Sequence, residues 1–82
     1  MLDFKTIDNT VNYDDILVQF GKNLKTIRLE KKITQEKLAL ENNFDPTYIS
    51  LLERGKRNPS LKTIYQLSCF LDVQIADLVR IS

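Results

Sequence analysis

The amino-acid sequence predicts an all-α protein: a compact bundle of five helices preceded by an N-terminal arm. Only two glycines and two prolines occur among the 82 residues, and this composition favours helices. Apolar residues also recur at helical spacing along most of the chain, and residues that typically begin or end helices separate these stretches. We therefore expect one small domain at residues 14–82, with the arm at residues 1–13.

The arm and the first helix differ in their patterns. Residues 1–12 show no helical periodicity, whereas an amphipathic helix is predicted to begin near Asp14 and to end near Lys31 and Lys32. The two lysines suit the negative end of the helix dipole. The apolar residues that share one face of this helix are Leu17, Phe20, Leu24 and Ile27.

Two short helices are predicted next. Thr34 is a suitable N-cap for a helix that ends shortly before Asn43, and asparagine tolerates the left-handed conformation that would turn the chain there. Asp45 and Pro46 predict the N-cap and the first residue of a third helix. Gly55 is predicted to end it.

The last two helices are predicted from a cap and from apolar spacing. Ser60 caps a fourth helix that Asp72 interrupts, and a short fifth helix covers roughly Ile75–Val79, with Leu78 facing inward. The apolar residues at core spacing in the fourth helix are Leu61, Ile64, Leu67 and Leu71.

The composition excludes several classes of function. With no histidine and a single cysteine, Cys69, the chain cannot form an internal disulfide, and we expect neither a metal site nor a cofactor. It offers no nucleophile–base pair and no glycine-rich phosphate loop, so we expect no enzyme activity and no small-molecule substrate. The absence of a disulfide framework fits the reducing cytoplasm. We find no signal peptide and no apolar stretch long enough to span a bilayer, so we expect no membrane partner. Cys69 is interpreted as a small core or interface residue, with a redox switch as the alternative.

Charge is unevenly distributed along the chain. Residues 1–15 carry four aspartates and one lysine, a net charge of −3, whereas residues 16–82 carry eleven Lys/Arg and seven Asp/Glu, a net charge of +4. A mildly basic body is compatible with phosphate binding, although many globular domains share it. The acidic arm has the wrong sign to lie along DNA.

The second and third predicted helices are separated by little more than Asn43 and Phe44, which is the layout of a helix-turn-helix. The chain resembles the phage-repressor (Cro/C1, XRE-type) helix-turn-helix family over about residues 16–80, through FGKNLKTIRLEKKITQEKLA, YISLLERGKRNPSLKTI and FLDVQIADLV. Its length and its TYIS and ERGKRNPS segments also resemble the small controller proteins of restriction–modification systems. The resemblance implies a lambda-repressor-like DNA-binding bundle. Asn43, Lys32 and Asp72 stand where that family often has glycine.

The third helix is predicted to be the one that reads DNA. At about 100° per residue, Ile49, Leu52 and Glu53 point one way, and a second set of residues points roughly the opposite way. Hydroxyls of this second set can donate to or accept from base edges, and its methyl groups can contact thymine. We expect base contacts from Pro46, Thr47, Ser50 and Leu51; the alternative is an ordinary solvated face.

At three of these four positions, Pro46, Thr47 and Leu51, the resembled family often has long polar base readers. This chain carries no arginine, glutamine or asparagine there. Specificity is therefore expected to depend on apolar contacts, water or DNA shape.

Phosphate contacts are expected around this helix. The resemblance implies that Gln35 contacts a phosphate, and its alternative is a residue of the capping turn. Tyr48 can either bond a phosphate or pack against its neighbours. The remaining expected phosphate contacts leave the end of the reading helix, with a plain solvated charge run as the alternative: Arg54, Lys56, Arg57 and Asn58.

Two further sets of residues are interpreted as structural. The resemblance implies an ion pair between Arg28 and Glu53 that joins the first and third helices. It also implies a dimer through the last two helices, with half-sites about 34 Å apart. The candidate interface residues, which could alternatively complete the monomer core, are Phe70, Val73, Ile75, Val79 and Ile81.

Together these features predict a sequence-specific transcription regulator that binds double-stranded DNA as a homodimer on a palindromic operator. Control of restriction–modification genes is the narrower form of this hypothesis. The alternative is an antitoxin-like or adaptor module of the same fold, whose partner is another protein.

Overall fold

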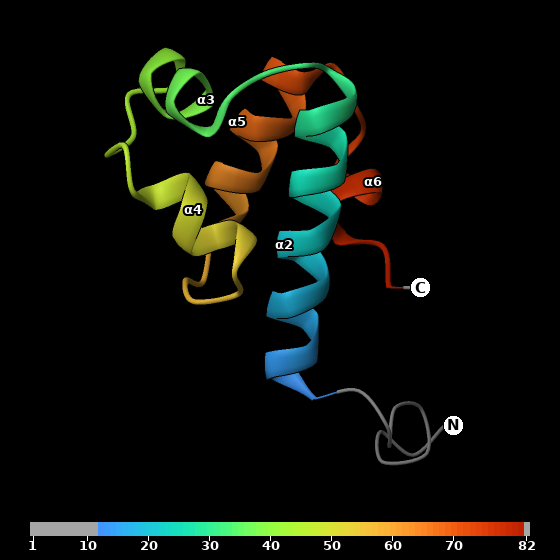
Figure 1. The fold of residues 1–82 in the computed structure, drawn as a ribbon. Coiled ribbons are helices and arrows are strands. Elements are labelled where there is room, and N and C mark those ends of the chain that lie inside the picture. Colours follow the sequence, from blue (N-terminus) through green and yellow to red (C-terminus); the bar gives the residue numbers. More distant parts are fainter. Residues whose placement is uncertain (1–11, 82) are drawn as a thin grey trace.

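The computed structural model describes residues 12–81. Within this range the chain forms five α-helices and no β-strand (Figure 1), so the predicted all-helical fold is confirmed. Residues 1–11 of the predicted arm lie outside the described residues. The helices are α2 (Tyr13–Glu30), α3 (Gln35–Glu41), α4 (Tyr48–Glu53), α5 (Leu61–Leu71) and α6 (Ile75–Val79).

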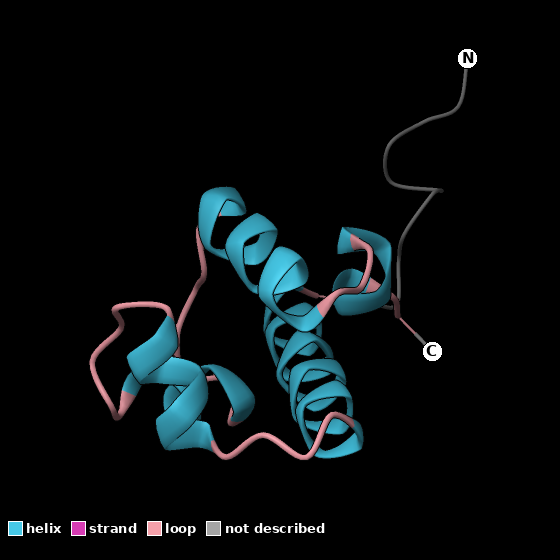
Figure 2. Ribbon diagram, turned by 90° about the horizontal axis from the view of Figure 1, so that it is seen from above, coloured by secondary structure: helices cyan, strands magenta, loops and turns pink. Residues whose placement is uncertain are grey.

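The longest helix, α2, is central to the arrangement. Helix α4 packs against one side of α2 and α6 against the other, while α3 packs on α4 and α5 on α6 (Figure 1). Seen from above, the helices are joined by short loops (Figure 2). The two short helices α3 and α4 are therefore held as a pair at one side of the molecule.

Helix α2 begins one residue earlier than predicted because of a cap that the periodicity did not reveal. The side-chain Oδ1 of Asn12 accepts from the backbone N–H of Asp15 at 3.0 Å, and the carboxylate of Asp15 accepts from the backbone N–H of Asn12 at 3.3 Å. This reciprocal capping box satisfies two backbone donors at the helix start. At the other end, Lys32 adopts a left-handed φ of 59°, where the resembled family often has glycine.

The turn between α3 and α4 forms as predicted at Asn43, which has a left-handed φ of 58°. The backbone N–H of Phe44 donates to the carbonyl of Ala39 at 2.9 Å, and the Ala39 side chain is completely buried. The side-chain amide of Asn42, also buried, donates to the carbonyl of Leu38 at 2.8 Å. This closed turn fixes the angle at which the chain enters α4.

The predicted start of α4 at Pro46 is wrong by two residues. Pro46 and Thr47 form a turn in which the N–H of Tyr48 donates to the carbonyl of Asp45 at 2.9 Å, and the helix begins at Tyr48. The turn is closed by a bond between residues three apart, whereas the bond from the N–H of Leu51 to the carbonyl of Thr47, between residues four apart, makes Thr47 the residue before the first turn of the helix. Asp45 still caps the segment, as its carboxylate accepts from the N–H of Thr47 at 2.9 Å. Gly55 ends it with a φ of 71°, as predicted.

Every described helix contributes to one hydrophobic core. Leu78 faces inward as predicted, but the prediction that Leu61 lies at a core position is wrong, because this side chain is 73% exposed. Leu61 is the first residue of α5, and the deeply buried positions begin only two turns later, at Leu67. The buried core residues are Phe20, Leu24, Ile27, Leu38, Ala39, Ile49, Leu52, Leu67, Leu71 and Leu78.

Helices α2 and α4 touch at their backbones through a glycine that the sequence patterns did not single out. Gly21 is buried in the middle of α2. A Cβ atom added there would lie 2.5 Å from the carbonyl oxygens of both Leu52 and Glu53, which is closer than such atoms can approach. The position of α4 therefore depends on the absence of a side chain at Gly21.

We expect the Gly21→Ala substitution to lower the free energy of unfolding by about 1–3 kcal/mol, because the added methyl group would push α4 away from α2. Helix propensity alone would favour alanine by about 1 kcal/mol, so a net loss reports the steric contact. Urea denaturation measures the change. The exposed neighbour Lys22, changed to alanine, is the control and should stay within about 0.5 kcal/mol of wild type. A Gly21→Ala protein as stable as wild type would contradict this contact.

Candidate nucleic-acid interface

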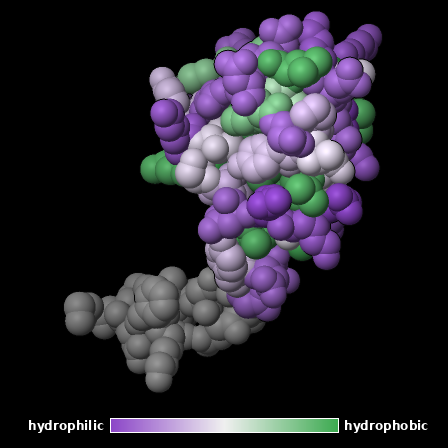
Figure 3. Space-filling view, turned by 90° about the vertical axis from the view of Figure 1, so that its left-hand side faces the viewer, coloured by the Kyte–Doolittle hydropathy of each residue, from purple (hydrophilic) through white to green (hydrophobic). Residues whose placement is uncertain are grey.

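Helix α4 is divided into a buried side and an outward side. The side chains of Ile49, Leu52 and Glu53 form its buried side. The predicted base-contacting residues lie on the other side: Pro46 and Thr47 are exposed, and Ser50 and Leu51 are half-buried. Viewed from the side of α3 and α4, the surface is mainly hydrophilic with scattered hydrophobic side chains (Figure 3). The described molecule therefore leaves this side of α4 open to a partner.

A buried ion pair holds α4 in place. The Nε of Arg28 donates to Oε2 of Glu53 at 2.6 Å, and its Nη2 donates to Oε1 at 3.0 Å. The side chains of Arg28 and Glu53 are only 8% and 2% exposed. The remaining guanidinium nitrogen donates to the carbonyl of Ile33 at 2.8 Å. The expected pair is thus present, and it joins α2 and α4 to the loop before α3.

Gln35 extends this pair into a three-helix network that sequence reasoning missed. Its side-chain Nε2 donates to Oε1 of Glu53 at 2.9 Å, so the Gln35 side chain is anchored on α4. A primary amide has a second hydrogen and an acceptor oxygen, and the residue is only half-buried at the start of α3. Gln35 can therefore brace Glu53 and still offer a polar group to a phosphate.

Asp45 and Thr47 form a local hydrogen-bonded unit beside the outward side of α4. The hydroxyl of Thr47 donates to Oδ1 of Asp45 at 2.7 Å, and the same oxygen accepts from the Thr47 backbone N–H. These two bonds hold the pKa of the Asp45 carboxyl below its usual value, so the group is ionised at neutral pH. A threonine hydroxyl can donate or accept, as expected for Thr47 from the sequence, but here its proton is already directed to Asp45.

The predicted phosphate-contacting residues surround α4. Arg54, Lys56, Arg57 and Asn58 are all exposed, and the Nε of Arg54 lies 3.4 Å from the carbonyl oxygen of Ser50, to which it donates. Tyr48 is half-buried, and its ring packs edge-on against Phe44 with centroids 5.0 Å apart. The packing role considered for Tyr48 is therefore real, whereas a phosphate bond from its hydroxyl stays a prediction.

The C-terminal apolar residues divide into two groups. Phe70, Val79 and Ile81 are 37%, 43% and 50% exposed, as expected of surface that a partner could cover. Val73 and Ile75 are half-buried, and Val73 packs against the monomer core. The alternative reading, that these residues complete the monomer core, thus applies in part to Val73.

Cys69, on α5, is exposed. The core role considered for it is therefore wrong. An interface role is not affected by this exposure.

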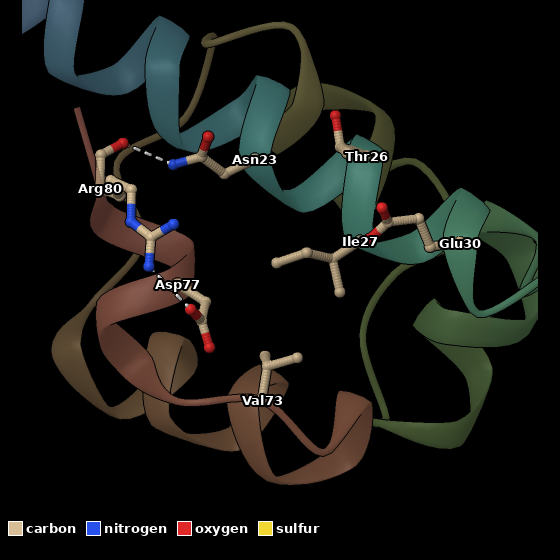
Figure 4. A pocket seen from close by; sticks show the side chains of 7 residues that line it. All are labelled: Asn23, Thr26, Ile27, Glu30, Val73, Asp77 and Arg80. Atoms are coloured by element: carbon tan, nitrogen blue, oxygen red, sulfur yellow. Dashed lines mark hydrogen bonds and ion pairs between the residues drawn. The ribbon is translucent and has the colours of Figure 1, made fainter. Parts of the chain in front are cut away.

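A cavity of about 320 Å³ opens on the other side of α2, away from α4. Asn23 lines this cavity, and its side-chain amide donates to the backbone carbonyls of Leu78 and Arg80. Arg80, which also lines the cavity, forms an exposed ion pair with Asp77 at 3.1 Å (Figure 4). The described residues include no cluster of three or more acidic, cysteine or histidine side chains that could hold a metal ion. In the same part of the chain, no helix is long and apolar enough to cross a membrane.

The short helices α3 and α4 are held on the longer α2 by a buried ion pair, and the outward side of α4 is open. This arrangement defines a helix-turn-helix protein. Residues 24–78 match the helix-turn-helix family model, and the chain belongs to this family, whose members are DNA-binding regulators without enzymatic activity. The chain is 46% identical over 67 residues to control protein C.BamHI of Bacillus amyloliquefaciens, covering 80% of this chain and 83% of that protein. It is 39% identical over 66 residues to control protein C.MunI of a Mycoplasma species, covering 79% and 89%.

Solved structures show the same likeness. The restriction–modification controller protein C.AhdI from Aeromonas hydrophila superposes with a TM-score of 0.72 at 40% identity, over 76% of this chain and 94% of that chain. The controller protein C.Esp1396I superposes with a TM-score of 0.69 at 37% identity, over 83% and 86%. The predicted resemblance to controller proteins is thereby confirmed.

We expect removal of one partner of the buried pair, in Arg28→Met, to lower the free energy of unfolding by about 3–5 kcal/mol, because it leaves the Glu53 carboxylate buried without its cation. The double substitution Arg28→Met with Glu53→Leu should recover much of this loss, since it removes both charges. The exposed pair supplies the control: Arg80→Met should cost less than about 1 kcal/mol. Thermal and urea denaturation measure all three. A double variant less stable than Arg28→Met would show that the pair is not the source of the effect.

Proposed function

We propose that this protein is a sequence-specific transcription regulator that binds operator DNA as a homodimer. The observation that carries the proposal is the orientation of α4: its apolar side is buried and locked by Arg28 and Glu53, while its Thr47 side is open. A helix held in this way is suited to enter the major groove of DNA. The similarity to control proteins supports the same assignment.

In this proposal the open side of α4 meets base edges. Thr47 and Ser50 provide hydroxyl groups and Leu51 an apolar contact for a thymine methyl, while Pro46 lies against the groove wall. Gln35 and Tyr48 contact phosphates at the start of α3 and α4. The exposed residues that follow α4 contact the DNA backbone on the exit side, where they position the protein without selecting sequence: Arg54, Lys56, Arg57 and Asn58.

The proposed dimer forms through α5 and α6. Phe70, Val79 and Ile81 leave apolar surface exposed near the C-terminal end of the described chain, and Val73 and Ile75 lie half-buried beside them. Two copies related by a twofold axis would read two half-sites of a palindromic operator about 34 Å apart. We further propose that the controlled genes are those of a restriction–modification system and that the protein acts in the cytoplasm.

The distinction between phosphate and base contacts gives a paired prediction. Wild-type affinity for random duplex DNA should fall steeply as salt concentration rises, because phosphate contacts release counterions. Arg57→Ala should weaken binding to all sequences alike and reduce the slope of log affinity against log salt by about one. Thr47→Ala should instead change the preferred sequence found by selection from random DNA. Fluorescence anisotropy over a salt series measures the first effect.

The reverse pattern, with Thr47→Ala lowering the salt slope and Arg57→Ala altering the selected sequence, would mean that the open side of α4 is misassigned. Wild-type protein that fails to bind any duplex at low salt would favour the protein–protein module instead.

The dimer interface gives a further prediction. Val79→Asp should raise the dimer dissociation constant at least tenfold, because it places a charge in an apolar contact. Analytical ultracentrifugation measures it. Leu61→Asp is the matched control, since Leu61 is even more exposed but lies outside the proposed interface, and it should leave self-association unchanged. If the two substitutions weakened self-association equally, the interface would have to extend to the start of α5.

A further inference from the structure

We propose that Asp45 is a specificity-determining residue that acts through Thr47: it makes this part of the protein select bases that present an exocyclic amino group in the major groove. These bases are adenine and cytosine. The inference rests on the proposed function, because it requires that the Thr47 side of α4 faces the major groove. It adds a residue that was expected only to cap the helix.

The geometry determines which hydrogen-bonding role is left to Thr47. A threonine hydroxyl has one proton and two acceptor lone pairs. The proton is directed to Oδ1 of Asp45, with an oxygen–oxygen distance of 2.7 Å, and the Thr47 N–H donates to the same carboxylate oxygen at 2.9 Å. A hydrogen bond to an ionised carboxylate is stronger than one between neutral groups. The exposed hydroxyl of Thr47 is therefore presented to a partner as an acceptor.

Base edges in the major groove differ in the donors they offer. Cytosine presents its N4 amino group and adenine its N6 amino group, whereas guanine presents the acceptors N7 and O6 and thymine the acceptor O4. An acceptor-only hydroxyl can bond to cytosine or adenine but meets only acceptors on guanine or thymine. The negative charge of Asp45 opposes the same two acceptor-rich edges, so the two residues favour the same outcome.

The neighbouring residues do not counteract this preference. The chain has no lysine or arginine between residues 44 and 50, so this segment lacks the cation that usually reads guanine. Pro46 brings neither an N–H nor a polar side chain. Among the described residues, the ion pairs are those of Arg28 with Glu53 and of Arg80 with Asp77, so the charge of Asp45 is not neutralised by either.

The test is selection of bound duplexes from a random pool with the full chain and four variants. Wild type should show one position in each half-site where adenine or cytosine is preferred to guanine or thymine by about tenfold, the discrimination typical of a good base contact. Thr47→Ser keeps the hydroxyl and should keep the preference. Thr47→Val and Asp45→Ala should both reduce this preference to less than about threefold. The first removes the hydroxyl oxygen, and the second removes the acceptor of the Thr47 hydroxyl proton, so that the hydroxyl can also donate to a base.

The Asp45→Asn substitution distinguishes two possibilities: that residue 45 acts through Thr47, and that it contacts the base directly. Asparagine retains a side-chain oxygen that can hold the Thr47 proton, so at least part of the preference for adenine or cytosine should persist. Its other group is a donor, and reversal of the preference toward guanine or thymine would show that residue 45 touches the base itself, which would overturn the route through Thr47. Thermal melts establish that each variant is folded.

A modified base provides an independent measurement. Each amino group has one hydrogen in the Watson–Crick pair and one facing the groove, and a methyl group on the nitrogen replaces the second. A duplex with N6-methyladenine or N4-methylcytosine at the selected position should bind wild type about tenfold more weakly, whereas Thr47→Val should bind both duplexes alike. Equal binding of the two duplexes by wild type would overturn the inference.

The controls distinguish this inference from the proposed function. If wild type shows no salt-dependent binding to DNA, the proposed function fails, and the inference fails with it. If wild type binds DNA but Asp45→Ala selects the same bases with the same strength, only the role of Asp45 is overturned.

Discussion

The buried contact between Arg28 and Glu53 determines how the rest of the molecule is arranged. Helix α4 has only six residues, too few to be stable or oriented without tertiary contacts. The bidentate pair attaches its last residue to α2, and the additional bonds from Gln35 and to the carbonyl of Ile33 connect α3 and the preceding loop to the same charge centre. Because all buried side-chain polar atoms in the described residues have hydrogen-bond partners, this network orients α4 without leaving an uncompensated group.

The fold also depends on positions at which the backbone geometry matters more than a side-chain contact. Gly21 lets α2 and α4 approach until their backbones meet. Lys32, Asn43 and Asp72 all adopt left-handed conformations at helix ends, where glycine would have no steric penalty. Asparagine and aspartate tolerate this region well, whereas lysine does so less readily. The three short turns therefore place the helices with a small local strain that the shared core offsets.

Sequence patterns predicted most of the fold, because helix periodicity and caps are local features. The core positions Phe20 and Leu24, the stop at Gly55 and the left-handed Asn43 all follow from spacing or residue type. Features that depend on two distant segments were missed: the Gly21 contact and the Gln35–Glu53 bond join residues on different helices, and no local pattern encodes them. The exposure of Leu61 and Cys69 was missed for the same reason, since burial depends on which neighbours cover a helix face. For the candidate interface, the sequence indicated the outward residues of α4 but not the direction of the Thr47 proton.

The turn formed by Asp45, Pro46 and Thr47 has a consequence for the thermodynamics of association. Long base-reading side chains such as arginine lose rotamer freedom when a complex forms, at about 0.5–1.5 kcal/mol for each immobilised side chain. Here proline restricts the backbone, and the backbone N–H and the side-chain hydroxyl of Thr47 each already donate to one carboxylate oxygen of Asp45. This segment is thus ordered before any encounter, so its short side chains offer little contact area but lose little conformational entropy on docking.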